Sequence, residues 1–192
     1  MLFGAVASII LGMGMPTVGV YVLLATLIAP AMVQAGVMPL AAHMFVLYFG
    51  MLSMVTPPIA IAAFAAANIA GASAWDTAVS AMKLGWTAYI VPFLFVMSPS
   101  MLLIGPVGPA VQATLTAIVG VWFITAGIVG YAKSRLGPVT RVMVALAGLA
   151  LLVPANAFKG ALYLDIAGAV VALFLGIKIY VLDPRREAAA RG

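Results

Sequence analysis

The sequence contains no cysteine among its 192 residues, and it has few charged side chains. The missing cysteine excludes disulfide bonds and thiolate metal sites. Charged residues make up only 7% of the chain, against about 25% in a typical soluble domain, while hydrophobic residues make up 66%. A soluble protein does not hide that much apolar surface. The composition therefore predicts an all-α integral membrane protein.

Several functional classes lack their signatures. The chain has no HExxH or GxSxG motif, no phosphate-binding glycine loop and no close pair of acids. We therefore expect no enzymatic activity, no ATP hydrolysis and no cofactor. The net charge of +5 does not indicate nucleic-acid binding, because every charged residue lies from Asp76 onward and most of them flank apolar segments, as in membrane loops.

The most informative stretch is Gly12-Met13-Gly14-Met15-Pro16-Thr17, which we name the first break. It interrupts a charge-free apolar run from residue 1 to residue 33. Irregular backbone at membrane depth is tolerated only where it is buried in protein or lines a cavity. Freed carbonyl groups can bind a hard cation, and the N–H groups at the start of the next helix can bind an anion. Close helix packing is the competing explanation.

A second break, residues 53–58, interrupts the next apolar run. It contains Thr56-Pro57-Pro58, and Ser53 and Thr56 add hydroxyl groups. Proline removes a backbone donor and restricts the residue before it, so two prolines in sequence predict a discontinuous helix. Alone, such a break is more typical of a kink, but two breaks together match transporters whose discontinuous elements meet near the membrane midplane.

The apolar runs predict the following organisation. Residues 2–33 form either one kinked span or, as we favour, a re-entrant helical hairpin. A broken helix over 40–70 follows a turn at 34–39, and a polar connection over 71–82 leads to a span over 83–104. Residues 105–182 form a three-helix extension, and 183–192 form a cytoplasmic tail. The predicted fold thus has a hairpin, a discontinuous helix and about four further transmembrane helices.

The positive-inside rule gives an orientation. Basic residues gather in one loop and in the tail, namely Lys133, Arg135 and Arg141, and Arg185, Arg186 and Arg191. Two spans separate these clusters, so both are placed in the cytoplasm together with the 71–82 connection. The turn at 34–39 is then outside, and the hairpin interpretation places Met1 outside as well. A start outside without a preceding span favours a fragment of a longer protein.

A few isolated polar residues lie in the apolar segments. His43, the single histidine, is interpreted as a hydrogen-bonded structural residue, since no acid lies near it in the sequence. Asn68 is expected to bond across helices, and Asp165 to lie near the membrane interface although ionisable residues in spans are functional candidates. Tyr21, Tyr48 and Gln34 are interpreted as packing or interface residues.

The motifs resemble a known family. Ile10-Leu11-Gly12-Met13-Gly14-Met15-Pro16-Thr17, with Tyr21 to Leu24 and Ala29-Pro30, is similar to the second half of the large permease subunit of tripartite ATP-independent periplasmic (TRAP) transporters. Pro39 to His43, Thr56-Pro57-Pro58, Ala70-Gly71 and Ile90 to Phe93 resemble the fused permeases of the TAXI subclass. The resemblance runs from about Ile10 to Leu103.

This resemblance implies an elevator-type secondary transporter with inverted repeats in the bacterial inner membrane. It implies that a hairpin and a broken helix from each repeat frame a site for Na⁺ and a carboxylate substrate, which a periplasmic binding protein delivers. Residues 1–104 then correspond to the second repeat, and the first repeat is missing from the chain. We therefore expect the C-terminal part of a permease, which does not transport alone.

Two functional hypotheses follow. In the first, the two breaks form a Na⁺ site from the carbonyl groups of residues 12–15 and Thr56 and the hydroxyls of Thr17 and Ser53. The predicted sodium- and substrate-binding residues also include Met13, Met15, Pro16, Pro57 and Pro58. Sodium then lowers the free energy of placing an organic acid there. In the second, the chain is a stand-alone membrane scaffold or assembly subunit whose breaks serve packing. The reading frame upstream of Met1 distinguishes the two.

Overall fold

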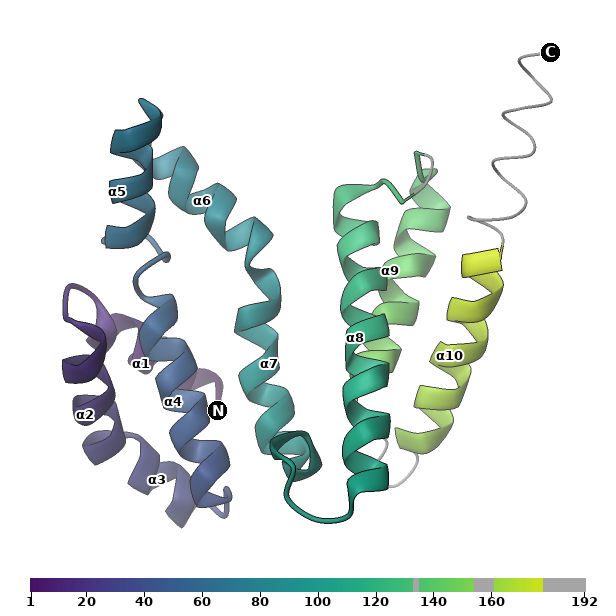
Figure 1. Cartoon of the computed structure of the whole chain (residues 1–192), viewed down its shortest axis with the longest axis horizontal. Coiled ribbons are helices and arrows are strands. Elements are labelled where there is room, and N and C mark those ends of the chain that lie inside the picture. The colour runs from purple at the N-terminus through teal and green to yellow at the C-terminus, as the bar shows by residue number, and fades with distance from the viewer. Residues whose placement is uncertain (133–134, 154–160, 178–192) are drawn as a thin grey trace. The chain divides into compact units, whose positions relative to one another are not determined.

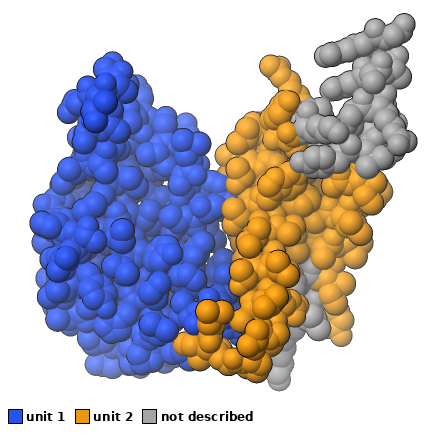
Figure 2. Space-filling model, viewed as in Figure 1, with its two compact units in different colours: residues 1–102 blue, residues 103–192 orange. Residues whose placement is uncertain are grey.

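The structure, a computed structural model, describes residues 1–132, 135–153 and 161–177. It divides into two compact units, Met1–Leu102 (unit 1) and Leu103–Gly192 (unit 2), which are coloured separately in Figure 2. Apart from one isolated β-bridge between Tyr131 and Arg135, the elements of the described residues are helices. The predicted all-α class is therefore confirmed for this part of the chain.

Unit 1 is built from short helices separated by turns (Figure 1). In chain order they are α1 (Leu2–Gly12), α2 (Thr17–Leu27), α3 (Ala29–Gln34), α4 (Pro39–Leu52), α5 (Ile61–Ala70), α6 (Ala74–Leu84), α7 (Trp86–Met97) and the 3₁₀ turn η1 (Pro99–Leu102). Helix α4 is the centre of this unit, since α1, α2, α3 and α7 all pack against it.

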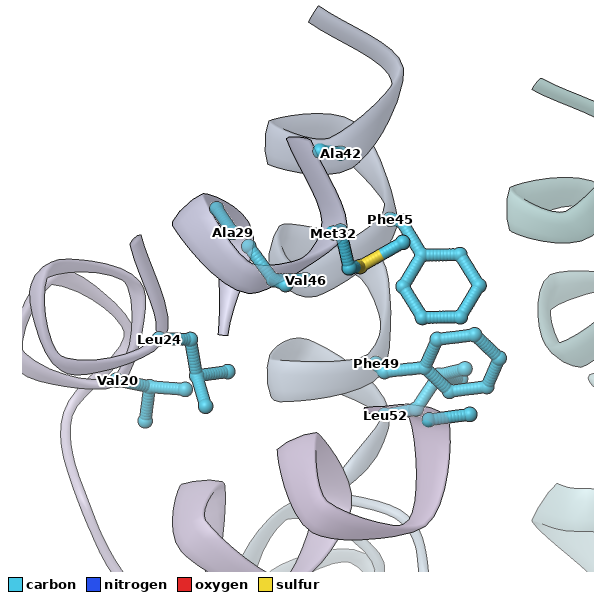
Figure 3. Packing of buried hydrophobic residues seen from close by; sticks show 10 residues of the cluster. Val20, Leu24, Ala29, Met32, Ala42, Phe45, Val46, Phe49 and Leu52 are labelled. Atoms are coloured by element: carbon cyan, nitrogen blue, oxygen red, sulfur yellow. The ribbon is translucent and has the colours of Figure 1, made fainter. Parts of the chain in front are cut away.

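The core of unit 1 lies along α4 (Figure 3). Phe45 and Phe49 are fully or almost fully buried, and their rings lie 4.8 Å apart between centroids. Each also meets the ring of Phe93 on α7 edge to face, at 5.3 and 5.4 Å. Aromatic pairs in this geometry stabilise by about 0.5–1.5 kcal/mol beyond their buried area. The cluster therefore ties α7 to α4.

A close helix approach holds α2 against the opposite side of α4. A side chain at Gly50 would place its Cβ 2.6 Å from Val20 Cγ1 and 2.8 Å from Leu24 Cδ1. Both of these side chains are buried, and Figure 3 shows them on α2 facing α4. Small residues at helix interfaces let backbones come close, which is how helices associate in lipid. Gly50 thus provides the notch that receives α2.

The described residues of unit 2 form three longer helices, α8 (Val107–Val129), α9 (Pro138–Leu152) and α10 (Ala161–Ile177). Glycines bring the first two together, because an added Cβ at Gly148 would lie 2.6 Å from the carbonyl oxygen of Gly120. Arg141 at the start of α9 donates from Nε to Gly127 O at 2.5 Å and from Nη2 to Ile128 O. A guanidinium at the C-terminus of α8 satisfies carbonyls that the helix leaves open.

Several stretches fit a membrane environment. Among the described residues, Thr17–Gln34 and Val107–Val129 are long and apolar enough to cross a membrane. The pair Ala74–Leu84 and Trp86–Met97, bent by 43°, makes a third if it counts as one span. Helix α1 has 11 residues, or about 16 Å at 1.5 Å per residue, which is about half of the hydrocarbon core. Membrane re-entry of the 2–33 hairpin stays a prediction.

Most of residues 71–82, which the sequence predicts as a polar connection, form a helix. Helix α6 begins at Ala74, because Ser73 caps it by accepting a hydrogen bond from the Asp76 N–H at 3.4 Å. Asp76 lies in its first turn and Lys83 in its last, where each charge complements the helix dipole. The turn at 154–160, the tail and the side chain of Asp165 lie outside the described residues.

Candidate functional site

The first break has the irregular backbone that its sequence predicts. Helix α1 ends at Gly12 and α2 begins at Thr17, and Gly14 between them has a φ of +81°, a conformation that favours glycine. No backbone N–H of the described residues donates to the carbonyl oxygens of residues 12–15. These oxygens therefore have no backbone hydrogen-bond partner among the described residues.

The start of α2 offers unpaired donors beside those oxygens. Pro16 is its N-cap and provides no side-chain cap, and the first helical bond runs from Val20 N to Pro16 O at 3.0 Å. The N–H groups of the first turn thus have no helical partner. Thr17 is half-buried at the first helical position, and its hydroxyl makes no hydrogen bond within the described part of the chain. The first break thus presents both acceptors and donors.

The second break is a true interruption of a helix. Helix α4 ends at Leu52 and α5 begins at Ile61, and the bond between Pro57 and Pro58 is cis. Ala60, just before α5, has a φ of +39°, a left-handed conformation that is uncommon for a residue other than glycine. The interruption falls in the segment where the sequence predicts a discontinuous helix. Strained backbone of this kind concentrates at functional sites and switch regions.

The two hydroxyls of the second break both point their protons back into α4. Ser53 is buried and donates from Oγ to Gly50 O at 2.6 Å. Thr56 is half-buried and donates from Oγ1 to Leu52 O at 2.6 Å. A hydroxyl has one proton and two lone pairs, so both oxygens keep acceptor capacity but no proton. Such oxygens suit a cation better than a carboxylate.

The two breaks lie side by side in unit 1. A side chain at Gly12 would place its Cβ 2.9 Å from Ser53 Oγ and 3.0 Å from Gly50 O, and one at Gly14 would reach Ile59 Cδ1 at 3.9 Å. The structure thus brings the start of the first break against the second. It gives no hydrogen bond between Thr17 and the second break among the described residues, so this part of the predicted site stays a prediction.

Two further residues near the breaks were missed by the sequence analysis. Ser8 on α1 is fully buried, and its Oγ is the one buried side-chain oxygen or nitrogen without a hydrogen bond in the described residues. It lies one turn before Gly12, and the spacing Gly4, Ser8, Gly12 is a signal of close helix packing that could have found it. Tyr89 on α7 bonds Thr56 at 2.7 Å, a pairing across 33 residues that no local motif indicates.

The other polar residues singled out in the sequence, His43, Tyr21 and Asn68, lie outside the two breaks. The Tyr21 hydroxyl lies 3.0 Å from His43 Nδ1, which agrees with a structural, hydrogen-bonded histidine. Asn68 is exposed near the end of α5. The described residues contain no group of three or more His, Asp or Glu side chains that could hold a metal ion. A cation at the breaks would therefore rely on neutral oxygens.

Comparison with known proteins identifies the family. No curated protein and no solved structure matches the chain. The family model described as "Tripartite ATP-independent periplasmic transporter, DctM component" matches residues 1–111, which is more than half of the chain and includes both breaks. The resemblance seen in the sequence is thus confirmed at the level of the family, while the TAXI subclass stays a prediction. The chain belongs to the DctM component family of the tripartite ATP-independent periplasmic transporters.

Proposed function

We propose that this chain is the C-terminal part of a Na⁺-coupled TRAP permease that imports organic acids across the bacterial inner membrane. Family membership makes it a permease component with a membrane context and a periplasmic binding protein as partner. The coupling ion, the carboxylate substrate and the TAXI-type binding protein are the proposed refinements. The single observation that carries the sodium site is the contact of Gly12 with Ser53, which sets the start of the first break against a hydroxyl oxygen whose proton is already committed.

The proposed Na⁺ ligands are all oxygens. They are the carbonyl groups of residues 12–15 and of Thr56, and the hydroxyls of Thr17 and Ser53. Hard cations prefer oxygen ligands, and unwound backbone in transporters coordinates Na⁺ in this manner. Ser53 supports this assignment because its proton is committed to Gly50 O, so its oxygen keeps only acceptor capacity.

The same arrangement explains coupling to an anion. The N-terminal end of α2 carries unpaired N–H groups and the positive end of the helix dipole. A carboxylate there still lies in a region without a basic residue, since the chain has no charge before Asp76. A bound Na⁺ adds the missing positive charge and lowers the free energy of the bound anion. Reciprocally, the anion raises the affinity for Na⁺.

The proposal includes parts that this chain does not supply. An elevator-type transporter with inverted repeats needs a second hairpin and a second broken helix, which the missing N-terminal half would provide. The three helices after residue 105 would form an extension, with the basic loop and tail in the cytoplasm. These statements rest on the resemblance and on the positive-inside rule, and the substrate within the organic acids is open.

The test is Na⁺-driven uptake by the full permease with its binding protein in proteoliposomes. We expect Ser53→Ala and Thr17→Val to raise the half-saturating Na⁺ concentration about tenfold each, because a hydrogen bond or contact to a charged group is worth about 1.5–3 kcal/mol. Thr26→Val is the matched control, since the Thr26 hydroxyl bonds only its own helix at Val22 and Leu23. An unchanged sodium dependence in both site variants contradicts the assignment.

A further inference from the structure

Tyr89 belongs to the second break although it lies on another helix. Its hydroxyl is 2.7 Å from Thr56 Oγ1, and it reaches there from α7, the helix that Phe93 ties to α4. The Tyr89 ring is partly buried and packs against the same core cluster. The position of its hydroxyl is therefore set by packing rather than by the hydrogen bond alone.

Counting protons decides the direction of this hydrogen bond. Thr56 Oγ1 lies 2.6 Å from Leu52 O, and a carbonyl oxygen only accepts. The single hydroxyl proton of Thr56 is thus committed to Leu52 O. The proton between Thr56 and Tyr89 must then come from Tyr89, so Tyr89 donates and Thr56 accepts.

The result is a chain of hydrogen bonds with one direction, from Tyr89 to Thr56 to Leu52 O. Leu52 O also accepts from the N–H groups of Val55 and Thr56 at 3.1 and 3.0 Å, so this end of α4 is well supplied with donors. Because Thr56 donates to a carbonyl, its oxygen becomes a better acceptor for Tyr89. Thr56 keeps one unused lone pair, Tyr89 keeps two, and neither keeps a proton.

We propose that Tyr89 is a positioning residue of the transport site, which holds Thr56 in place and makes this part of the second break accept a cation rather than an anion. The inference rests on the proposed function, since it concerns the same sodium site. A carboxylate near this pair would face lone pairs only and be repelled, whereas Na⁺ would be coordinated. Substrate is thereby directed to the donors at the start of α2.

The experiment is a double-mutant cycle in the full permease with its binding protein. Tyr89→Phe removes the donor but keeps the ring in the core. We expect the half-saturating Na⁺ concentration to rise about fivefold, since one buried hydrogen bond is worth about 1 kcal/mol. The maximal uptake rate at saturating Na⁺ should stay within about twofold, because the chemistry of the substrate site is unchanged.

The cycle separates positioning from simple folding effects. In a Thr56→Val background, Tyr89→Phe should add nothing, whereas in a Thr56→Ser background its fivefold effect should remain. Tyr48→Phe is the control, since Tyr48 packs its ring on Phe95 in the same unit. A second readout is the rise in melting temperature of the purified permease on adding NaCl instead of KCl, which Tyr89→Phe should reduce and Tyr48→Phe should not.

Each outcome bears on one of the two proposals. If Thr56→Val shifts the sodium dependence but Tyr89→Phe does not, or if Tyr89→Phe acts equally in the Thr56→Val background, the role of Tyr89 is overturned and the sodium site stands. If Thr56→Val, Ser53→Ala and Tyr89→Phe all leave the sodium dependence and the NaCl-induced stabilisation unchanged, the sodium site itself is overturned, and the role of Tyr89 with it.

Discussion

Unit 1 and unit 2 treat their backbone hydrogen bonds in opposite ways. Unit 1 interrupts its helices at both breaks and leaves the carbonyl groups of residues 12–15 without backbone donors. In unit 2, α8 is continuous for 23 residues, and Arg141 donates hydrogen bonds to the carbonyl oxygens of Gly127 and Ile128 near its end. Among the described residues, α8 thus has no interruption like the two breaks of unit 1.

The glycines show the same difference. In unit 2, Gly120 and Gly148 bring backbone against backbone and serve only close packing. In unit 1, Gly12 brings backbone against the hydroxyl of Ser53 at a break. Substituting glycines in each unit should therefore separate loss of function from loss of stability, and the following predictions use that contrast.

The largest expected effect is that of Gly12→Val. Its Cβ would lie 2.9 Å from Ser53 Oγ and 3.0 Å from Gly50 O, so the two breaks must move apart. Overpacking of this kind costs about 1–3 kcal/mol, and we expect sodium-driven uptake to fall more than tenfold. The control is Gly19→Val, where nothing lies within 4 Å of an added Cβ. Equal uptake by both variants would contradict the contact between the breaks.

The second prediction concerns Gly148→Val in unit 2. An added Cβ would lie 2.6 Å from Gly120 O and 2.7 Å from Ile124 Cγ1, so α8 and α9 must separate. We expect a lower melting temperature and less folded protein, but an unchanged half-saturating Na⁺ concentration for the molecules that fold. Gly176→Val, where the added side chain meets nothing within 4 Å, is the control. A sodium shift here would show that the units are functionally coupled.

The smallest effect is expected from Ser8→Ala. Ser8 Oγ has no partner among the described residues, so its removal relieves an unsatisfied buried group. The free energy of unfolding should stay the same or rise by no more than about 1–3 kcal/mol, which a melting curve measures. Ser53→Ala is the matched comparison, because Ser53 Oγ is bonded to Gly50 O. A marked loss of stability in Ser8→Ala would mean that its hydroxyl binds something in the working protein.

The sequence was sufficient to locate both breaks, because glycine and proline act on the backbone locally. Gly14 takes a positive φ and the Pro57–Pro58 segment ends α4 whatever surrounds them. The start of α6 was missed because the polar residues around Ser73 resemble a loop, although Ser73 and Asp76 form an N-cap. Loops and helix N-caps use the same polar residue types, so composition alone does not distinguish a loop from the start of a helix.

The partners of the breaks were harder to predict. Tyr89 reaches Thr56 only because Phe93, one turn further along α7, packs on Phe45 and Phe49. That contact joins residues 33 positions apart through tertiary packing, so no local motif or periodic pattern in the sequence predicts it. Ser8 shows the intermediate case, since small residues at every fourth position indicate close packing but do not show which hydroxyl lacks a partner.

The notch at Gly50 has a consequence for motion. Val20 and Leu24 occupy it so closely that an added Cβ would come within 2.6 and 2.8 Å of them. Side chains locked into a notch resist sliding along the neighbouring helix, because packed interfaces shift between discrete arrangements rather than deforming continuously. We therefore expect α2 and α4 to move together as a single rigid body, and a disulfide engineered between them should leave that movement unhindered.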